Sequence, residues 1–182
     1  QQLTNTISEI SNTKNSITVS TTSSFAAMWL VPNLSKFYQL YPDIDVAVKT
    51  GEQVDDLEKD RRIDLAIRYG THDDSLKNST LLTTEDIGMY ATPNYIESIH
   101  SLADANLLET KWQNKNLAEV SWQTLLQGSG NHALAYKTRQ FTQEHHIIQA
   151  ALAGQGIALV SSLLVRNAIE QGWLVKYNFI EN

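Results

Sequence analysis

Apolar and polar positions in the first part of the chain follow two different periods, and these predict a strand followed by a helix. Residues 17–21, ITVST, are short and rich in β-branched side chains, as in a buried strand. From Phe25 to Tyr41 apolar residues recur at intervals of three and four, the spacing of one helix face. Pro32 lies inside this pattern, so it either kinks the helix or marks the first turn of its main part.

Two further strands are predicted at residues 44–50, IDVAVKT, and 64–70, DLAIRYG, with a polar helix between them at 53–62. This order of strands and helices with short connections predicts right-handed crossovers and a parallel sheet. Ligands bind beyond the carboxyl ends of the strands in such sheets. Here those ends are residues 20–24, 49–51 and 68–70.

The rest of the chain repeats an α/β pattern. Its clearest part is HIIQAALAGQGIALV, where apolar positions predict a helix that Gly154 ends and a buried strand at 157–160. Ser161 or Ser162 is then expected to cap another helix that runs to Gly172.

Composition narrows the possible functions. The 182 residues are 42% hydrophobic, enough for one core or two small lobes. The absence of cysteine excludes disulfides, thiolate metal sites and a cysteine nucleophile. A net charge of −6 argues against direct binding of nucleic acid by this segment, because such binding depends on Lys and Arg that neutralise phosphates. With neither a signal-peptide pattern nor a long apolar run, the sequence predicts a cytoplasmic protein with no membrane contact.

The run Thr21, Thr22, Ser23 and Ser24 is the first candidate site. It lies where a strand gives way to a helix N-terminus, which presents backbone N–H groups and the positive end of the helix dipole. The hydroxyl groups therefore either cap the helix or hold a small anion.

Arg68, followed by Tyr69, is the second candidate. An arginine at the end of an apolar strand is costly unless it is paired or faces a ligand, and a guanidinium can fork to a carboxylate. The alternative is an internal salt bridge to Asp64, Asp73 or Asp74.

Neither a catalytic centre nor a metal or cofactor site is predicted. Residues 72–74, HDD, have metal-ligand types but only loop spacing, and a solvated loop explains them. His145 and His146 are adjacent, so on a helix they point about 100° apart. The chain contains no GxSxG elbow, GxGxxG fingerprint or P-loop.

Taken together, residues 17–48, 64–70 and 147–165 resemble the effector-binding domain of LysR-type transcriptional regulators, especially the branch of the glycine-cleavage and β-lactamase activators. The resemblance covers most of residues 17–176, in order and at the expected spacings. It implies an α/β, two-lobed fold of the type 2 periplasmic-binding-protein kind, each lobe a Rossmann-like sheet flanked by helices, joined by two crossing strands. Lobe I would comprise 17–90 and 162–182, lobe II 91–161, and residues 1–16 would be a linker remnant.

The resemblance also implies roles for particular residues. Effector contacts would come from the hydroxyl run, from the third strand and from the start of a lobe II helix: Thr21, Thr22, Ser23, Ser24, Arg68, Tyr69, Gln143 and Glu144. The hinge would include Ala91, Thr92, Pro93, Val160 and Ser161. Subunits would pair through the first helix, with Trp29, Asn33, Lys36 and Phe37 at the interface, although simple core packing also explains these apolar positions.

The implied function is a sensor that closes on a small anionic or zwitterionic metabolite between its lobes. It would control DNA binding by an N-terminal winged helix-turn-helix absent from this chain, in a homodimer or tetramer. From their expected position, Ser24→Ala and Arg68→Ala are predicted to weaken binding and leave the melting temperature nearly unchanged. The alternatives are a solute-binding protein of a transport system, which needs a leader peptide, and a two-lobed enzyme, which needs a catalytic pair.

Overall fold

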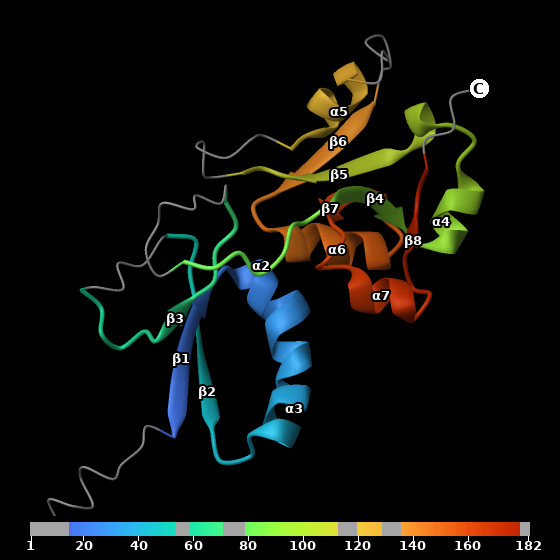
Figure 1. The fold of residues 1–182 in the computed structure, drawn as a ribbon. Helices are drawn as coiled ribbons and strands as arrows, with labels where there is room; N and C mark the ends of the chain where they lie inside the picture. The colour runs from blue at the N-terminus through green and yellow to red at the C-terminus, as the bar shows by residue number, and fades with distance from the viewer. Residues whose placement is uncertain (1–14, 54–58, 71–78, 113–119, 129–135, 179–182) are drawn as a thin grey trace, which may run out of the picture. The chain divides into compact units, whose positions relative to one another are not determined.

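A computed structural model describes residues 15–53, 59–70, 79–112, 120–128 and 136–178. The chain divides into two compact units, Gln1–Tyr69 and Gly70–Asn182, called unit 1 and unit 2 below (Figure 1). Each unit contains its own β-sheet, so each is described by itself. No helix among the described residues is long and apolar enough to cross a membrane.

Unit 1 begins with β1, Ser16–Thr21, which leads into one unbroken helical run. The run consists of α2 (Ser23–Phe25), a π-helical turn (Ala26–Leu30) and α3 (Val31–Leu40). Pro32 lies in the first turn of α3, which decides between the two predicted roles of this residue. Proline lacks the N–H that would continue the ladder, and a wider turn just before it is a common adjustment.

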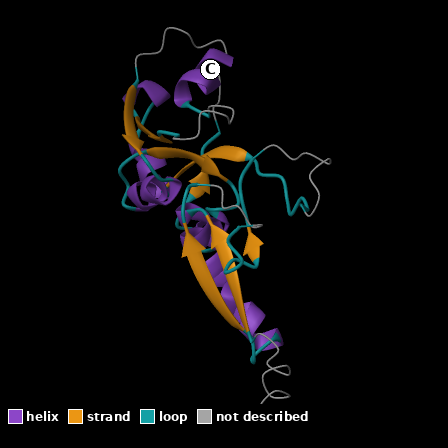
Figure 2. Ribbon diagram, turned by 90° about the vertical axis from the view of Figure 1, so that its left-hand side faces the viewer, coloured by secondary structure: helices purple, strands orange, loops and turns teal. Residues whose placement is uncertain are grey.

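The sheet of unit 1 has the order β2-β1-β3, and both outer strands run parallel to β1. β2 spans Asp45–Thr50 and pairs along the whole of β1, whereas β3 is only Leu65–Ala66. The helical run lies along one face of this sheet (Figure 2). The predicted parallel sheet is confirmed, but the third strand is shorter than the predicted 64–70. Residues 54–58 of the predicted polar helix lie outside the described residues.

Unit 2 is built around a mixed sheet of order β6-β5-β7-β4-β8. Its central strands β5 and β7 are parallel, and β4 runs antiparallel to both β7 and β8. In chain order the elements are β4 (Ile87–Ala91), α4 (Pro93–Ser98), a 3₁₀ turn (Leu102–Asp104), β5 (Asn106–Thr110), α5 (Trp122–Gly128), β6 (Lys137–Phe141), α6 (Glu144–Leu152), β7 (Ile157–Ser161), α7 (Arg166–Glu170) and β8 (Val175–Lys176).

The hydrophobic core of unit 2 lies on both faces of this sheet. Trp122 and Leu126 of α5 pack with Leu107 of β5 in a buried cluster. The Trp122 indole also donates to the Leu108 carbonyl oxygen at 3.0 Å, so its polar atom is satisfied. On α6 the predicted apolar face is Ile147, Ile148, Ala151 and Leu152; the first three are buried and Leu152 is half-buried, while Ala150 is buried as well.

The segment after β7 differs from its prediction. The helix expected to begin at Ser161 or Ser162 begins only at Arg166, and its N-cap residue Val165 makes no side-chain cap. Ser161 Oγ instead accepts the Leu163 N–H at 3.2 Å, in a turn that precedes α7. Hydroxyl side chains stabilise such turns as readily as helix starts, which is why the sequence pattern alone misplaced the boundary.

The two units also divide the chain differently from the predicted lobes. Residues 70–90 and 162–182, expected in lobe I, belong to unit 2. The physical reason is strand pairing, because β8 hydrogen-bonds to β4 with Ala91 opposite Val175. Which residues move together as a lobe stays a prediction.

Candidate functional site

The junction of β1 and α2 carries the hydroxyl run, and Thr22 is its capping residue. Thr22 has an extended backbone, and its side chain accepts the Phe25 N–H at 3.4 Å. This is the ordinary N-cap arrangement, in which a hydroxyl replaces a partner missing at the first turn. The predicted capping role is therefore carried by one residue of the four.

Thr21, the last residue of β1, has a different role. Its side chain is 0% exposed, and its Oγ1 has no hydrogen-bond partner among the described residues. Leaving a buried hydroxyl unsatisfied costs about 1–3 kcal/mol, so such atoms are rare, and a water molecule, an ion or a ligand group commonly completes them. This atom is the strongest indication in unit 1 that the end of β1 takes a polar ligand group.

The loop after β2 lies over this junction. The Gly51 N–H donates to the Thr21 carbonyl oxygen at 3.0 Å, and the Ser23 N–H donates to Glu52 Oε1 at 3.3 Å. Sequence reasoning missed Glu52, although it follows a strand end that the sequence placed at the ligand edge. The signal was available in the parallel order of the strands, because their carboxyl ends meet at one edge.

Arg68 is held inside unit 1 by hydrogen bonds. Its Nη2 donates to Ser20 Oγ at 2.8 Å and to the Gln53 carbonyl oxygen at 3.1 Å. Its Nη1 donates to the Ile67 carbonyl oxygen at 2.8 Å. This geometry joins β1 to the loop after β2. Of the predicted salt-bridge partners, Asp64 accepts the Thr18 N–H through Oδ2 at 2.8 Å, and Asp73 and Asp74 lie outside the described residues.

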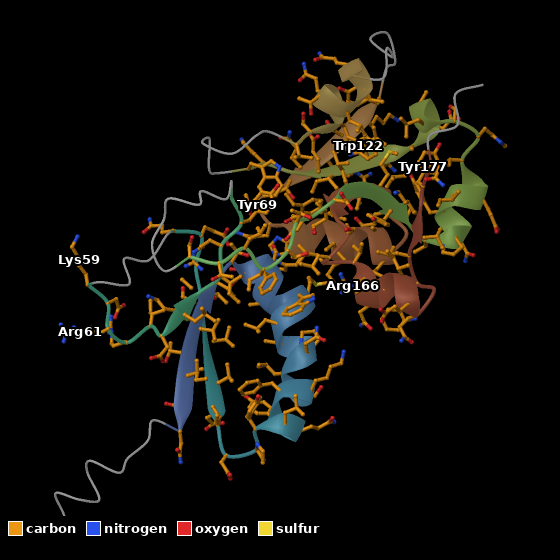
Figure 3. All side chains as sticks on the ribbon, viewed as in Figure 1. Lys59, Arg61, Tyr69, Trp122, Arg166 and Tyr177 are labelled. Carbon is orange, nitrogen blue, oxygen red and sulfur yellow. The ribbon has the colours of Figure 1, made fainter. Side chains whose placement is uncertain are left out.

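The remaining predicted contacts of unit 1 differ in exposure. Ser24 is only 6% exposed, so it belongs to the buried part of the junction, whereas the Tyr69 side chain is 48% exposed. Tyr69 follows Arg68 at the end of unit 1 (Figure 3).

Elsewhere in unit 1, Asp60 carries a perturbed carboxyl group. The Arg62 guanidinium hydrogen-bonds to Asp60 at 2.8 Å, and this bond lowers the pKa of the Asp60 carboxyl from 3.8 to about 2. Lys49 Nζ lies 3.6 Å from the same carboxylate and lowers its pKa further. At the surface, Arg62 and Lys49 offset the negative charge of Asp60, so this ion-pair cluster stabilises the loop locally.

In unit 2 the predicted ligand residues Gln143 and Glu144 lie at the start of α6. Gln143 is the N-cap residue and makes no side-chain cap, and Glu144 Oε1 accepts the Ser161 N–H at 3.2 Å. The structure thus brings Glu144 together with Ser161, a residue predicted for the hinge. Their role in ligand binding stays a prediction.

The two predicted hinge segments lie beside one another. β4 and β7 pair antiparallel, with Tyr90 opposite Ala158 and Gly88 opposite Val160. After Ala91, which is 0% exposed, Thr92 caps α4 and Pro93 is its first residue. The pairing agrees with two adjacent strands; whether they bend is untested.

Another buried hydroxyl occurs in unit 2, at the carboxyl end of β5. Thr110 is 7% exposed, and its Oγ1 has no hydrogen-bond partner among the described residues. The neighbouring Glu109 carboxylate is fully engaged, because it accepts the Trp122 N–H and the Gln140 amide, both at 2.8 Å.

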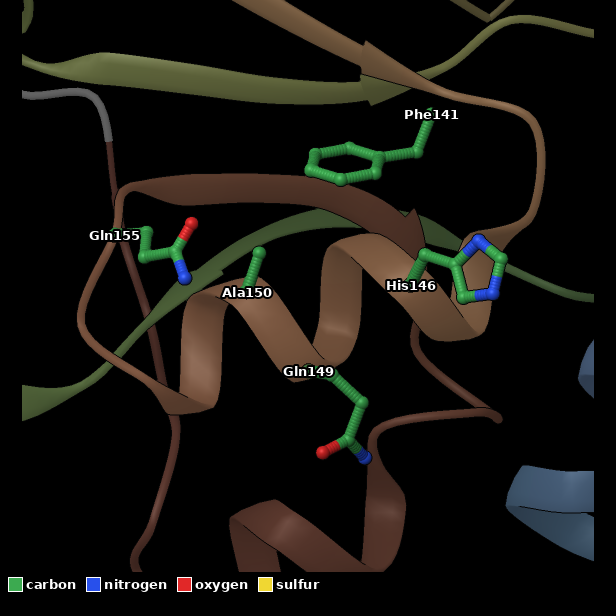
Figure 4. Close-up of a pocket in the computed structure, with 5 residues that line it drawn as sticks. All are labelled: Phe141, His146, Gln149, Ala150 and Gln155. Atoms are coloured by element: carbon green, nitrogen blue, oxygen red, sulfur yellow. The ribbon is translucent and has the colours of Figure 1, made fainter.

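Two shallow grooves lie on the surface of unit 2. One of about 390 Å³ lies between α6 and β6, with the Phe141 ring facing α6 near Ala150 (Figure 4). The other, of about 400 Å³, lies between α4 and the end of α6, beside Thr92 and Gly154. None of the predicted ligand-binding residues lines either groove, so neither is taken as the effector site.

The predicted dimer residues lie on the helical run of unit 1. Trp29 stacks on Phe25 with ring centroids 5.1 Å apart, and the Asn33 amide donates to the Trp29 carbonyl oxygen at 2.8 Å. Lys36 Nζ in turn donates to Asn33 Oδ1 at 3.1 Å. No residue of α3, including Phe37, is fully buried within the chain.

Among the described residues, no group of three or more histidine, cysteine or acidic side chains could hold a metal ion. The ring centroids of His145 and His146 lie 4.3 Å apart. Residues 72–74, the other pattern with metal-ligand types, lie outside the described residues.

Comparison with known proteins decides the family. The family model of the LysR substrate binding domain matches residues 11–181. The chain belongs to this family. The glycine cleavage system transcriptional activator of Escherichia coli K12 is 31% identical over 163 residues, which cover 89% of this chain and 53% of the relative. The transcriptional activator AmpR of Citrobacter koseri is 23% identical over 160 residues, covering 88% of this chain and 55% of AmpR.

The solved structures agree on the fold. An effector binding domain from Citrobacter freundii matches with a TM-score of 0.68 at 20% identity, covering 91% of this chain and 82% of that chain. At this identity the likeness shows the fold, which is the predicted α/β fold of LysR effector-binding domains. The resemblance to the glycine-cleavage and AmpR branch is confirmed, and the relatives are transcriptional regulators rather than enzymes. The chain spans about half the length of the curated relatives it matches.

Proposed function

We propose that this chain is the effector-sensing part of a LysR-type transcriptional regulator and binds a small anionic or zwitterionic metabolite at the carboxyl end of β1. The observation that carries the site is Thr21 Oγ1, a fully buried hydroxyl without a hydrogen-bond partner among the described residues. A ligand oxygen or nitrogen here would satisfy that hydroxyl beside a helix start. Whether Tyr69, Gln143 and Glu144 take part stays a prediction.

Effector binding controls such a protein through its differential affinity for two conformations. A ligand that prefers one conformation about a hundredfold shifts the equilibrium by roughly 2.7 kcal/mol. This free energy is sufficient to change how subunits of an oligomer are arranged, and so to change DNA contacts made by a separate domain. In this proposal the chain itself makes no base contacts, which agrees with its net charge of −6.

The partners belong to the proposal as well. Family membership supports a homodimer or tetramer that contacts DNA through a winged helix-turn-helix encoded upstream of Gln1, in the cytoplasm. The transport alternative makes a different prediction, a secretory signal in the same place. The gene sequence upstream of the Gln1 codon distinguishes the two, because a DNA-binding segment of about 60 residues fits only the regulator.

Thr21→Val tests the binding site. Valine has the shape of threonine without the hydroxyl, so the variant removes an unsatisfied polar atom and should keep or raise the free energy of unfolding. Affinity for an effector found in a screen of amino acids and organic acids should fall about tenfold, the value of one hydrogen bond. Calorimetry on the wild type and the variant measures this change.

Thr18→Val is the matched control, because it makes the same change on the same strand away from the junction. Equal affinities for the wild type and Thr21→Val would remove the site from the end of β1. A screen in which no metabolite binds the wild type would count against the sensor function itself.

A further inference from the structure

A carboxylate of the chain itself lies at the start of the helix that follows β1. Glu52 Oε1 accepts the Ser23 N–H at 3.3 Å. The first N–H groups of a helix have no partner within the helix and favour negative charge. Glu52 therefore already uses an amide that a ligand anion at this junction would need.

The loop around Glu52 is anchored on both sides. Before it, the Gly51 N–H donates to the Thr21 carbonyl oxygen at 3.0 Å. After it, the Gln53 carbonyl oxygen accepts Arg68 Nη2 at 3.1 Å. Because these bonds fix the backbone, the Glu52 carboxylate is presented to Ser23. In water, repulsion between two unit negative charges about 4 Å apart weakens the binding of an anion about fivefold. The Glu52 carboxylate therefore disfavours a second anion at this position.

Thr21 supplies an independent reason to expect a ligand group at this position. Its side chain is 0% exposed, and its Oγ1 has no partner among the described residues, although Thr22 and Ser23 beside it are hydrogen-bonded. The junction thus carries one unused hydroxyl, at the end of β1, and one carboxylate, at the amide two residues later. A ligand that fits both has a hydrogen-bonding oxygen and a cationic group.

We propose that Glu52 is a specificity-determining residue that selects against simple anions and favours ligands whose carboxylate is accompanied by an ammonium group. The ammonium group offsets the charge of Glu52 and donates to its oxygen atoms, whereas a simple carboxylate meets repulsion. The inference rests on the proposed function, since it takes this junction as the effector site. It narrows the ligand class from anionic or zwitterionic to zwitterionic.

The test follows the Ser23 amide resonance by NMR while acetate or glycine is titrated into the chain. These two probes differ only by the ammonium group. In the wild type, glycine should shift the Ser23 resonance at lower concentration than acetate. In Glu52→Gln, which keeps an oxygen acceptor but removes the charge, acetate should bind about fivefold more tightly, and glycine should lose its advantage.

Asp43→Asn is the matched control, because it removes one exposed negative charge of unit 1 at the other end of β2. It should titrate like the wild type. The inference is overturned if acetate affinity is the same in the wild type and Glu52→Gln, if the wild type prefers acetate, or if Ser23 responds to neither probe in any variant. The proposed function has a separate test in Thr21→Val, so failure of the inference is distinguishable from failure of the proposed function.

Discussion

At the scale of single residues, Arg68 differs most from what its place in the sequence suggests. The sequence left two roles open, a ligand contact and a salt bridge. The structure shows a further role, because the guanidinium joins Ser20, Gln53 and Ile67 within unit 1. Arginine suits this task because its planar fork serves several oxygen acceptors at fixed angles. Through its bond to Gln53, the residue also anchors the loop that carries Glu52, beside the proposed effector site.

This geometry changes the prediction for Arg68→Ala. The sequence predicted a nearly unchanged melting temperature, but the structure predicts a loss of about 1–3 kcal/mol in the free energy of unfolding, because the buried Ser20 hydroxyl and two carbonyl oxygens lose a charged donor. Urea denaturation followed by circular dichroism measures it. Arg68→Lys should be intermediate, since it keeps the charge but not the fork. A melting curve for Arg68→Ala that overlays the wild type would restore the original expectation.

At the scale of elements, backbone geometry ends the helices of unit 2. Gly154 and Gly172 both have φ of +70°, and they follow α6 and α7 respectively. Only glycine adopts this left-handed region without strain, so each glycine ends its helix sharply. After Gly154 the chain turns directly into β7, and Gly156 passes so close to the Asn106 carbonyl oxygen that a Cβ there would overlap it.

Alanine substitutions should separate the two reasons for glycine, which are the left-handed backbone at Gly154 and the close approach to Asn106 at Gly156. Gly154→Ala has space for its Cβ, with only Thr92 Oγ1 at 4.0 Å, so its cost is the left-handed conformation, about 1 kcal/mol. Gly156→Ala should cost more than about 3 kcal/mol, because β5 and β7 must separate to admit the methyl group. Thermal denaturation of both variants ranks them.

Gly128→Ala serves as the control for this pair, since a Cβ there meets nothing within 4 Å and its φ is not positive. It should unfold like the wild type. Equal losses for Gly154→Ala and Gly156→Ala would contradict the steric explanation for Gly156.

At the scale of the whole molecule, the helical run of unit 1 is the proposed site of self-association. α3 buries no residue completely, and Leu40 at its end and Tyr41 after it are more than half exposed. Apolar surface of this kind is typical of an interface that a second copy covers. The interface residues predicted from the sequence, Asn33 and Lys36, are hydrogen-bonded to each other on this helix.

Asn33→Arg should dissociate the proposed dimer, because it places a bulky charge at the predicted interface. Ser35→Arg makes the same change about 200° around the helix and should leave the association unchanged. Sedimentation velocity over a range of protein concentrations measures the dissociation constant, which is expected to rise at least tenfold for Asn33→Arg. If both variants associate like the wild type, α3 is not the interface.

The sequence predicted the strands and helices whose signal is local. The β-branched residues of β1, the three-and-four spacing along the helical run and the apolar face of α6 all gave the correct element. The parallel pairing of β1 with β2 and β3 followed from the short connections. Local signals misplaced the helix start at Ser161, where a hydroxyl could serve either a turn or a helix. They also overestimated the length of β3, which is shorter than its apolar pattern.

By itself the sequence determined the fold family, through the resemblance of residues 17–48, 64–70 and 147–165 to LysR effector-binding domains. It also determined the junction of strand and helix where the candidate site lies, because periodicity and turn residues act over a few neighbours. Only the tertiary structure decided which hydroxyl caps the helix, which is buried without a partner, and that Arg68 and Glu52 meet this junction from distant positions. Such contacts depend on how loops fold back over the sheet. Composition and spacing along the chain do not encode that arrangement residue by residue.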